Sequence, residues 1–231
     1  MVRFAMPSAQ ETVQRARRWA SRPVLDDRKM LFPTFSAATN DRLACHGDYT
    51  RLASILLALA RTRAETVAGA IAEVGVWRGD SSVLLQAEAP ERDLHLFDTF
   101  EGFVDRDLGE LNCPEDAYRF RDTSVDRVRR RLPEHARVNM HPGLVPETLK
   151  AVRGETFAFV LLDLDVGAPT TASLEFFYPR MADGAYCFVH DYNSTESDWA
   201  CKRALDGFLA GRPERVIDLP DRYGSAMFRK L

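Results

Sequence analysis

The sequence lacks closely spaced cysteines and long apolar runs. Cys187 and Cys201, the closest pair of its four cysteines, are 14 positions apart, much wider than the spacing of about two to four residues in a zinc knuckle. The apolar run Ile55–Ala60 is far shorter than the roughly 20 residues that a membrane-spanning helix needs. We therefore expect a cytoplasmic protein with reduced thiols and no membrane contact.

The sequence also lacks a surplus of positive charge. It has 31 Lys and Arg residues against 34 Asp and Glu residues, a formal net charge of −3. Proteins that bind the phosphate backbone of nucleic acids usually carry a clear cationic surplus. The basic run at residues 127–131 is typical of a solvated helix face. We expect no nucleic-acid partner.

The 231 residues contain short apolar runs that alternate with helix-like stretches. The runs expected to be strands are Gly69–Val76, Leu94–Asp98, Arg137–Met140, Phe157–Leu162, Ala185–Val189 and Arg215–Ile217. A last run, Ser225–Arg229, follows turn-prone residues and is expected to pair back as an antiparallel strand. This alternation predicts an α/β fold: one doubly wound, mostly parallel Rossmann-like sheet with helices on both faces.

The first 48 residues follow a different pattern. They mix proline with aromatic residues and lack sustained periodicity, so we expect residues 1–48 to form an N-terminal arm or lid. From Tyr49 to Arg63 the apolar residues recur at helical spacing, which predicts a helix with one face packed on a core. We place the doubly wound domain at residues 49–231.

A segment with two glycines follows the first predicted strand: Glu73-Val74-Gly75-Val76-Trp77-Arg78-Gly79-Asp80. Glycine lets the backbone turn sharply, and ligands of open α/β sheets bind beyond the carboxyl ends of the strands. Trp77 stands where a dinucleotide fingerprint needs glycine, which argues against a bound pyrophosphate. The acidic residue two positions before the first glycine instead suits a cationic ligand, such as the amino group of a methionine moiety. An ordinary strand-to-helix turn is the alternative.

Asp98 ends the second predicted strand, 25 positions after Glu73. A carboxylate at this place can accept hydrogen bonds from both hydroxyls of a ribose, as acidic residues do in dinucleotide sites. Together the two acidic residues favour a nucleoside ligand. The alternative is that Asp98 caps the turn that follows it.

Four polar residues follow two further predicted strands: Asp163, Asp165, His190 and Asp191. The ends of parallel strands open onto the same edge, so we expect these side chains to converge in one cleft. Clustered carboxylates repel one another, and a divalent metal ion would relieve the repulsion. Oxygen ligands favour magnesium or calcium, whereas an imidazole shifts the preference towards manganese, iron or zinc. His190 could instead be a base or a structural histidine.

Several strings occur in a fixed order along the chain: Glu73–Gly79, Asp98–Phe103, Gly143–Leu149, Asp163–Asp165 with Thr170, and His190–Tyr192. Together they resemble the macrocin O-methyltransferase family, which uses S-adenosylmethionine to methylate sugar hydroxyls on macrolide and aminocoumarin antibiotics. The resemblance runs from about residue 49 to residue 208. It implies a class I S-adenosylmethionine-dependent methyltransferase domain, a small hydroxylated or glycosylated acceptor, assistance by magnesium or manganese, and a homo-oligomer.

The resemblance assigns roles to the residues near the cofactor. Glu73, Gly75 and Gly79 correspond to the loop at the methionine end of the cofactor. Asp98 corresponds to the ribose-binding acid, and Gly143 lies in the stretch near the cofactor and the active site. The residues expected to contact the cofactor are Glu73, Gly75, Trp77, Gly79, Asp98, Thr99, Phe100 and Gly143.

The resemblance also assigns roles to the acidic residues. Asp163 corresponds to a magnesium ligand, Asp165 to the general base and Asp191 to the second acid of an Asp-Asp-Tyr metal motif. His190 stands where that motif has its first Asp, and Gly167-Ala168 replaces an aromatic-acid pair. The expected metal ligands are Asp163, His190 and Asp191.

The residues leave more than one mechanism open. Asp165 is the favoured base for the acceptor hydroxyl, with His190 and His141 as alternatives, since an imidazole titrates near neutral pH. A cofactor-binding protein without catalysis would explain the departures from the family pattern. The second hypothesis for an enzyme is a metal-dependent glycosyltransferase. It would use the Asp-x-Asp residues to hold a nucleotide sugar through a cation.

Overall fold

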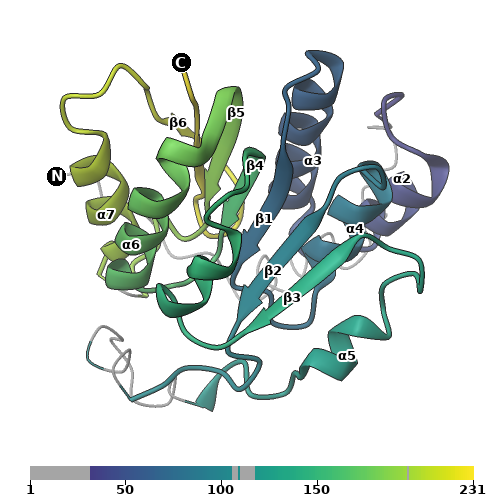
Figure 1. Ribbon diagram of the computed structural model, residues 1–231, viewed down its shortest axis with the longest axis horizontal. Coiled ribbons are helices and arrows are strands. Elements are labelled where there is room, and N and C mark those ends of the chain that lie inside the picture. The colour runs from purple at the N-terminus through teal and green to yellow at the C-terminus, as the bar shows by residue number, and fades with distance from the viewer. Residues whose placement is uncertain (1–31, 106–108, 110–117, 197) are drawn as a thin grey trace, which may run out of the picture. The chain divides into compact units, whose positions relative to one another are not determined.

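The computed structural model describes residues 32–105, 109, 118–196 and 198–231. A seven-stranded sheet with the strand order β3-β2-β1-β4-β5-β7-β6 runs through it (Figure 1). The strands are β1 (Ala70–Val74), β2 (Leu94–Asp98), β3 (Val138–Pro142), β4 (Phe157–Leu162), β5 (Met181–Val189), β6 (Ile217–Asp218) and β7 (Ala226–Arg229). Strands β1 to β5 pair in parallel, and β7 is antiparallel to both β5 and β6. The predicted fold class is confirmed.

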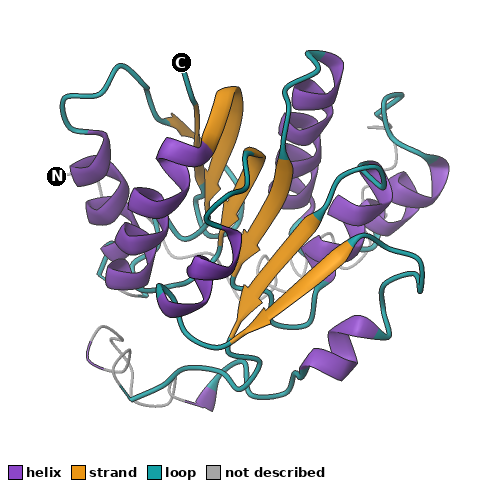
Figure 2. Ribbon diagram, viewed as in Figure 1, coloured by secondary structure: helices purple, strands orange, loops and turns teal. Residues whose placement is uncertain are grey.

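Helices cover both faces of the sheet (Figure 2). They are α2 (Ala37–Ala44), α3 (Tyr49–Ala64), α4 (Asp80–Glu88), α5 (Val125–Arg129), α6 (Gly167–Phe177) and α7 (Ala200–Leu209), with the short 3₁₀ helices η4 (Glu147–Val152) and η5 (Tyr178–Arg180). Helices α6 and α7 lie on one side, and α2, α3 and α4 lie on the other (Figure 1). No helix in the described parts of the chain is both long and apolar enough to cross a bilayer.

Strand β4 shows why the centre of the sheet is apolar. All its residues are buried, because β1 and β5 flank it and helices cover both its faces. A strand buried on two faces cannot alternate between apolar and polar positions. The ring of Phe157 packs edge-on against that of Phe177 from α6, with centroids 5.0 Å apart.

Helix α3 is the amphipathic helix predicted at residues 49–63. Its N-cap is Asp48, whose carboxylate accepts a hydrogen bond from the backbone N–H of Arg51 at 3.4 Å. The side chains of Leu52 and Ile55 are buried against the sheet and α4. This packing fixes the first turn of the helix beside the end of the sheet.

Several strand bounds differ from the sequence expectation, most of all in β5. Strand β5 begins at Met181 rather than Ala185, because its pairing with β4 shifts register and thereby extends the strand. Residues 34–231 form one compact unit in which α2 packs on α3 and α4. Residues 1–31, most of the expected arm or lid, lie outside the described residues, so the boundary at residue 48 stays a prediction.

Candidate active site

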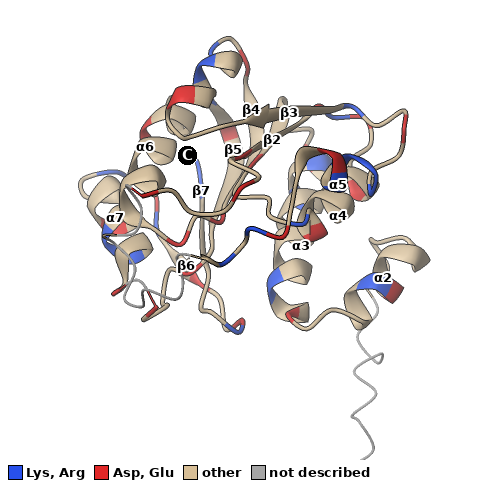
Figure 3. Ribbon diagram, turned by 90° about the horizontal axis from the view of Figure 1, so that it is seen from below, with Lys and Arg blue, Asp and Glu red and all other residues tan. Residues whose placement is uncertain are grey.

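Sharp backbone turns follow four neighbouring strands of the sheet. The residues with left-handed backbone angles there are Trp77 after β1, Phe100 after β2, Asp165 after β4 and Asp191 after β5, with φ values of 47°, 57°, 60° and 55°. Such conformations cost about 1–3 kcal/mol each in residues other than glycine, and they cluster at functional sites. Figure 3, seen from below, shows acidic positions in red on the loops between the two helix layers.

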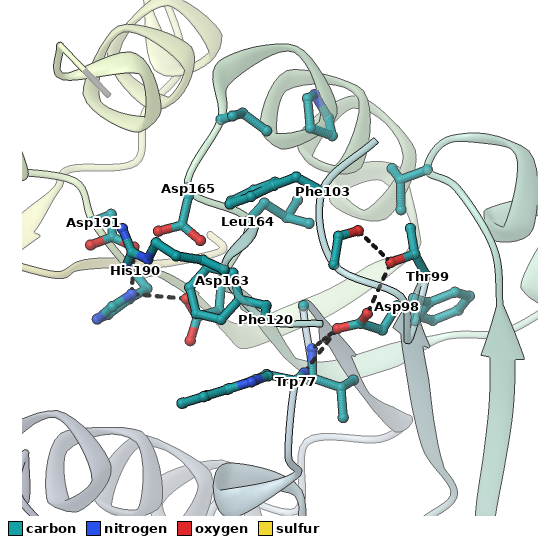
Figure 4. Close-up of a pocket in the computed structure, with 18 of the residues that line it drawn as sticks. Trp77, Asp98, Thr99, Phe103, Phe120, Asp163, Leu164, Asp165, His190 and Asp191 are labelled. Carbon is teal, nitrogen blue, oxygen red and sulfur yellow. Dashed lines mark hydrogen bonds and ion pairs between the residues drawn. The ribbon is translucent and has the colours of Figure 1, made fainter. Parts of the chain in front are cut away.

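These loops enclose a pocket of about 420 Å³, within the roughly 300–1,000 Å³ of small-molecule sites. Among the predicted residues, Gly75, Trp77, Asp98, Thr99, Gly143, Asp163, Asp165, His190 and Asp191 line it. Figure 4 shows Asp98 and Thr99 at one side of the pocket. At the opposite side lie Asp163, Asp165, His190 and Asp191, which we call the acidic corner. Three predicted residues, Glu73, Gly79 and Phe100, do not line the pocket.

Glu73 lies behind the loop instead of in the pocket. Its side chain is fully buried, and it accepts hydrogen bonds from the hydroxyls of Ser81 and Ser82 in the first turn of α4. Burial disfavours the charged form and raises the pKa of Glu73 to about 8, against the two serine hydrogen bonds that lower it. Ser81, which lines the pocket, therefore stands between Glu73 and the pocket.

Asp98 organises the backbone around the pocket. One carboxylate oxygen accepts hydrogen bonds from the N–H groups of Val76 and Trp77 at 2.6 and 2.9 Å. The other accepts from the N–H of Phe100 at 2.6 Å. The turn-capping alternative raised by the sequence is thus present, and Asp98 also faces the pocket.

Two glycines are required by close packing in this region. Gly75 has a φ of +88°, and a Cβ atom there would lie 1.7 Å from the carbonyl oxygen of Asp163. Gly79 has a φ of +75°, and its Cβ atom would lie 2.9 Å from Cγ1 of Val128. A larger residue is therefore excluded at Gly75 and strained at Gly79, whatever the two positions contact in a ligand.

In the acidic corner, Asp165 has the environment of a proton acceptor. Burial, followed by the negative charges of Asp191 and Asp163, raises the pKa of Asp165 well above its ordinary value. Once ionised, a carboxylate with a raised pKa is a stronger base than an ordinary one, although the same shift favours its neutral form. The alternative base His141 does not line the pocket; its ring stacks on that of Phe97 with centroids 4.4 Å apart.

The expected metal ligands come together. Donor atoms of Asp163, His190 and Asp191 lie within 4.8 Å of one another. However, Oδ1 of Asp163 lies 2.8 Å from Nδ1 of His190, and its Oδ2 lies 2.8 Å from Nη1 of Arg51. Burial opposes a charge on the imidazole, but the two carboxylates outweigh it and raise the pKa of His190 to about 11. Both oxygens of Asp163 thus already face nitrogen atoms of Arg51 and His190, so the arrangement does not fit a divalent ion.

Arg51, Phe120 and Tyr223 also line the pocket, and the sequence analysis missed all three. The ring of Phe120 lies edge-on to that of Trp77, with centroids 5.3 Å apart. The ring of Tyr223 lies edge-on to that of His190, with centroids 5.5 Å apart. Phe120 and Tyr223 come from segments without a motif. Arg51 carried a signal, because it stands four positions before Ile55 and so places a charge on the apolar face of its helix.

Comparisons with known proteins agree with this geometry. The model of the macrocin-O-methyltransferase (TylF) family matches residues 44–220. The chain is 29% identical over 160 residues to demethyldecarbamoylnovobiocin O-methyltransferase of Streptomyces niveus, covering 62% of this chain and 59% of that protein. It is 27% identical over 166 residues to 8-demethyl-8-(2,3-dimethoxy-alpha-L-rhamnosyl)-tetracenomycin-C 4'-O-methyltransferase of Streptomyces olivaceus, covering 62% and 60%. The chain thus spans about three fifths of the length of these curated relatives.

Solved structures share the fold. The O-methyltransferase NovP is 25% identical with a TM-score of 0.66, over 79% of this chain and 81% of that one. The calicheamicin methyltransferase CalS11 is 24% identical with a TM-score of 0.65, over 98% and 95%. Because the family model covers most of the sequence and the relatives carry the same activity in their names, the chain belongs to the macrocin-O-methyltransferase family.

Proposed function

We propose that this chain is an S-adenosylmethionine-dependent O-methyltransferase that methylates a hydroxyl of a small glycosylated or polyhydroxylated natural product. One observation carries the proposal: a single pocket contains both the Gly75 loop with Asp98 and the carboxyl group of Asp165. Methyl transfer is an in-line displacement, so donor and acceptor must meet in one water-poor space. The names of the relatives, which methylate novobiocin, tetracenomycin and mycinamicin precursors, support the acceptor class.

The end of the pocket beside β1 and β2 fits the cofactor. Oδ1 of Asp98 accepts a hydrogen bond from the N–H of Phe100 at 2.6 Å and a long one from the hydroxyl of Thr99 at 3.5 Å. A ribose hydroxyl that replaced the long contact would suit this oxygen. Ser81, in the first turn of α4, suits the charged methionine end, where backbone N–H groups and the helix dipole favour a carboxylate. When bound, S-adenosylmethionine supplies a methyl group on a positively charged sulfur.

At the acidic corner, Asp165 takes the proton from the acceptor hydroxyl. The acceptor oxygen forms its bond to the methyl carbon as the carbon–sulfur bond breaks, and the hydroxyl proton passes to the carboxylate of Asp165. General-base assistance of this kind contributes about 10²- to 10⁴-fold. His190 is held between Asp163 and Asp191 at 2.8 and 2.7 Å, which favours Asp165 over His190 as the base.

Aromatic side chains form an apolar wall of the pocket. The ring of Phe120 packs edge-on against Phe103 as well as Trp77, with centroids 5.5 and 5.3 Å apart. Figure 4 places Phe103 and Phe120 between the acidic corner and Asp98. Such rings pack against the apolar face of a sugar or an aglycone and exclude water. This wall supports a glycosylated acceptor.

The metal assistance implied by the resemblance is not part of this proposal, because cationic side chains contact the Asp163 oxygens. A glycosyltransferase is disfavoured by the family match. Because of the departures from the family pattern at His190 and Gly167-Ala168, a non-catalytic cofactor-binding protein is the alternative function.

The family resemblance also predicts a homo-oligomer. Size-exclusion chromatography would test this prediction.

The deciding experiment combines binding and turnover. Calorimetric titration of the full chain with S-adenosylhomocysteine is expected to give micromolar affinity. Incubation with methyl-labelled S-adenosylmethionine and either demethyldecarbamoylnovobiocin or mycinamicin III is expected to transfer label to at least one acceptor. If S-adenosylhomocysteine binds but no label is transferred to these acceptors or to a wider pool of glycosylated metabolites, the hypothesis of a non-catalytic binding protein is favoured. Absence of binding would overturn the proposal.

A further inference from the structure

Arg51 reaches the acidic corner from α3, the helix packed beside the sheet. Its Nη1 lies 2.8 Å from Oδ2 of Asp163, and its Nε lies 3.4 Å from Oδ2 of Asp48. All three side chains are largely buried: 18% of the Arg51 side chain is exposed, against 23% for Asp163 and 8% for Asp48. A guanidinium in this position is shielded from water and salt, so its attraction to the carboxylates is strong.

The imidazole of His190 lies beside the remaining oxygen of Asp163. Its Nδ1 lies 2.8 Å from Oδ1 of Asp163 and 2.7 Å from Oδ2 of Asp191. The two oxygens of Asp163 therefore each face a nitrogen of the chain, one from Arg51 and one from His190. These contacts occupy both oxygens of a carboxylate that an ion bound by Asp163, His190 and Asp191 would need.

We propose that Arg51 and His190 together take the place of a divalent ion, so that the acidic corner of this chain binds neither Mg²⁺ nor Mn²⁺. Arg51 is then a positioning residue, which fixes the carboxylate of Asp163 beside Asp165 as an ion would. The inference concerns the same pocket as the proposed methyl transfer and deepens that proposal, but it is tested by metal binding, which needs no turnover.

The packing of α3 keeps Arg51 in place. Leu52 follows it directly, and Ile55 stands one turn later on the same side; both are buried. The helix therefore cannot move away without exposing its apolar face to water. This exposure costs a free energy of about 25 cal/mol for each Å² of apolar surface. An ion entering the corner would also have to separate a largely buried Arg–carboxylate pair and leave the guanidinium without its partner.

The test is a titration of the full chain with Mn²⁺, read by the electron paramagnetic resonance of the free ion, with saturating S-adenosylhomocysteine. We expect no stoichiometric binding by the wild type up to about 1 mM. The double variant Arg51→Ala/His190→Asp, which removes the guanidinium and places an acid where the family motif has one, is expected to bind one ion at least about tenfold more tightly. If the first double variant unfolds at a much lower temperature than the wild type, Arg51→Met/His190→Asp replaces it in the titration. Methionine keeps most of the aliphatic length of Arg51.

The matched control is Arg61→Ala, on the same helix. Arg61 is 63% exposed and pairs with Glu65 at 2.5 Å, away from the pocket; this variant should bind no more Mn²⁺ than the wild type. One ion bound by the wild type and lost in Asp163→Asn would overturn the proposal. A folded double variant that binds no ion would overturn the roles of Arg51 and His190. His190 also lies within ligand distance of Asp48 and Asp221. Wild-type binding that persists in Asp163→Asn but is lost in Asp221→Asn would therefore also overturn the proposal.

Discussion

The carbonyl oxygen of Asp163 lies where a side chain on Gly75 would begin, 1.7 Å from the place of its Cβ atom. The end of β1, which carries the cofactor loop, and the end of β4, which carries the acidic corner, are therefore in direct backbone contact. The amide of Asp163 also donates a hydrogen bond to the carbonyl of Val74 at 2.8 Å. A change in the position of one loop must move the other.

We predict that Gly75→Ala destabilises the protein by more than about 3 kcal/mol, because the new methyl group meets the Asp163 backbone and the residue must keep a left-handed φ. Urea unfolding followed by circular dichroism measures this loss. The control is Gly154→Ala, where a Cβ atom meets nothing within 4 Å. A Gly75→Ala variant as stable as this control would refute the close contact.

We predict that Asp98→Asn weakens S-adenosylhomocysteine binding by at least about tenfold. Asparagine has one amide group where Asp98 has a second oxygen, so it cannot accept the hydrogen bonds of Trp77, Val76 and Phe100 together. Isothermal titration calorimetry gives the affinity. Asp93→Asn is the control, since Asp93 immediately precedes the same strand and pairs with Arg137 at 2.8 Å, at the other end of the sheet. Equal affinity in both variants would contradict the role of Asp98.

We predict that the stability of the ligand-free chain falls as pH rises from about 5 to 9 through the titration of Glu73. The pKa of Glu73 is about 8 in the folded chain against 4.5 as its ordinary value. Between about pH 4.5 and 8 the folded chain holds this proton while the unfolded chain has lost it. Stability therefore decreases in that range by about 1.4 kcal/mol per pH unit, a few kcal/mol at most, and levels off above the folded-state pKa.

The variant Glu73→Gln tests this pH dependence, because it removes the charge and keeps a hydrogen-bond acceptor for the serines. Its free energy of unfolding should decline less between pH 5 and 9 than that of the wild type. Glu175→Gln, at an exposed position of α6, should follow the wild type. Parallel profiles for wild type and Glu73→Gln would show that burial does not hold the proton on Glu73.

We predict that Asp165→Asn lowers kcat for methyl transfer at least about 100-fold while S-adenosylhomocysteine affinity changes little, because an amide cannot take the hydroxyl proton. Single-turnover kinetics with labelled cofactor measure this on whichever acceptor is methylated. Asp183→Asn, at an exposed position of β5, is the matched control. Undiminished turnover in Asp165→Asn would move the role of base to His190.

Much of the fold follows from local pattern. The all-apolar run Phe157–Leu162 predicts a central strand, and it lies in the middle of the sheet as β4. The turn-prone residues before Ser225–Arg229 predict an antiparallel return, which β7 makes beside β5. The register of β5 could not be predicted, because the shift in its pairing with β4 depends on contacts between strands.

The sequence by itself determined which chemical groups reach one edge of the sheet, because parallel strands present their ends together. Asp98 is the last residue of β2, and Asp163 and Asp191 follow the ends of β4 and β5. Only the tertiary structure decided how those groups are paired. It places Glu73 behind the loop, and it brings Arg51 from a helix 112 positions earlier onto Asp163. Pairing of this kind depends on distances between elements remote in the chain, and no local periodicity encodes those distances.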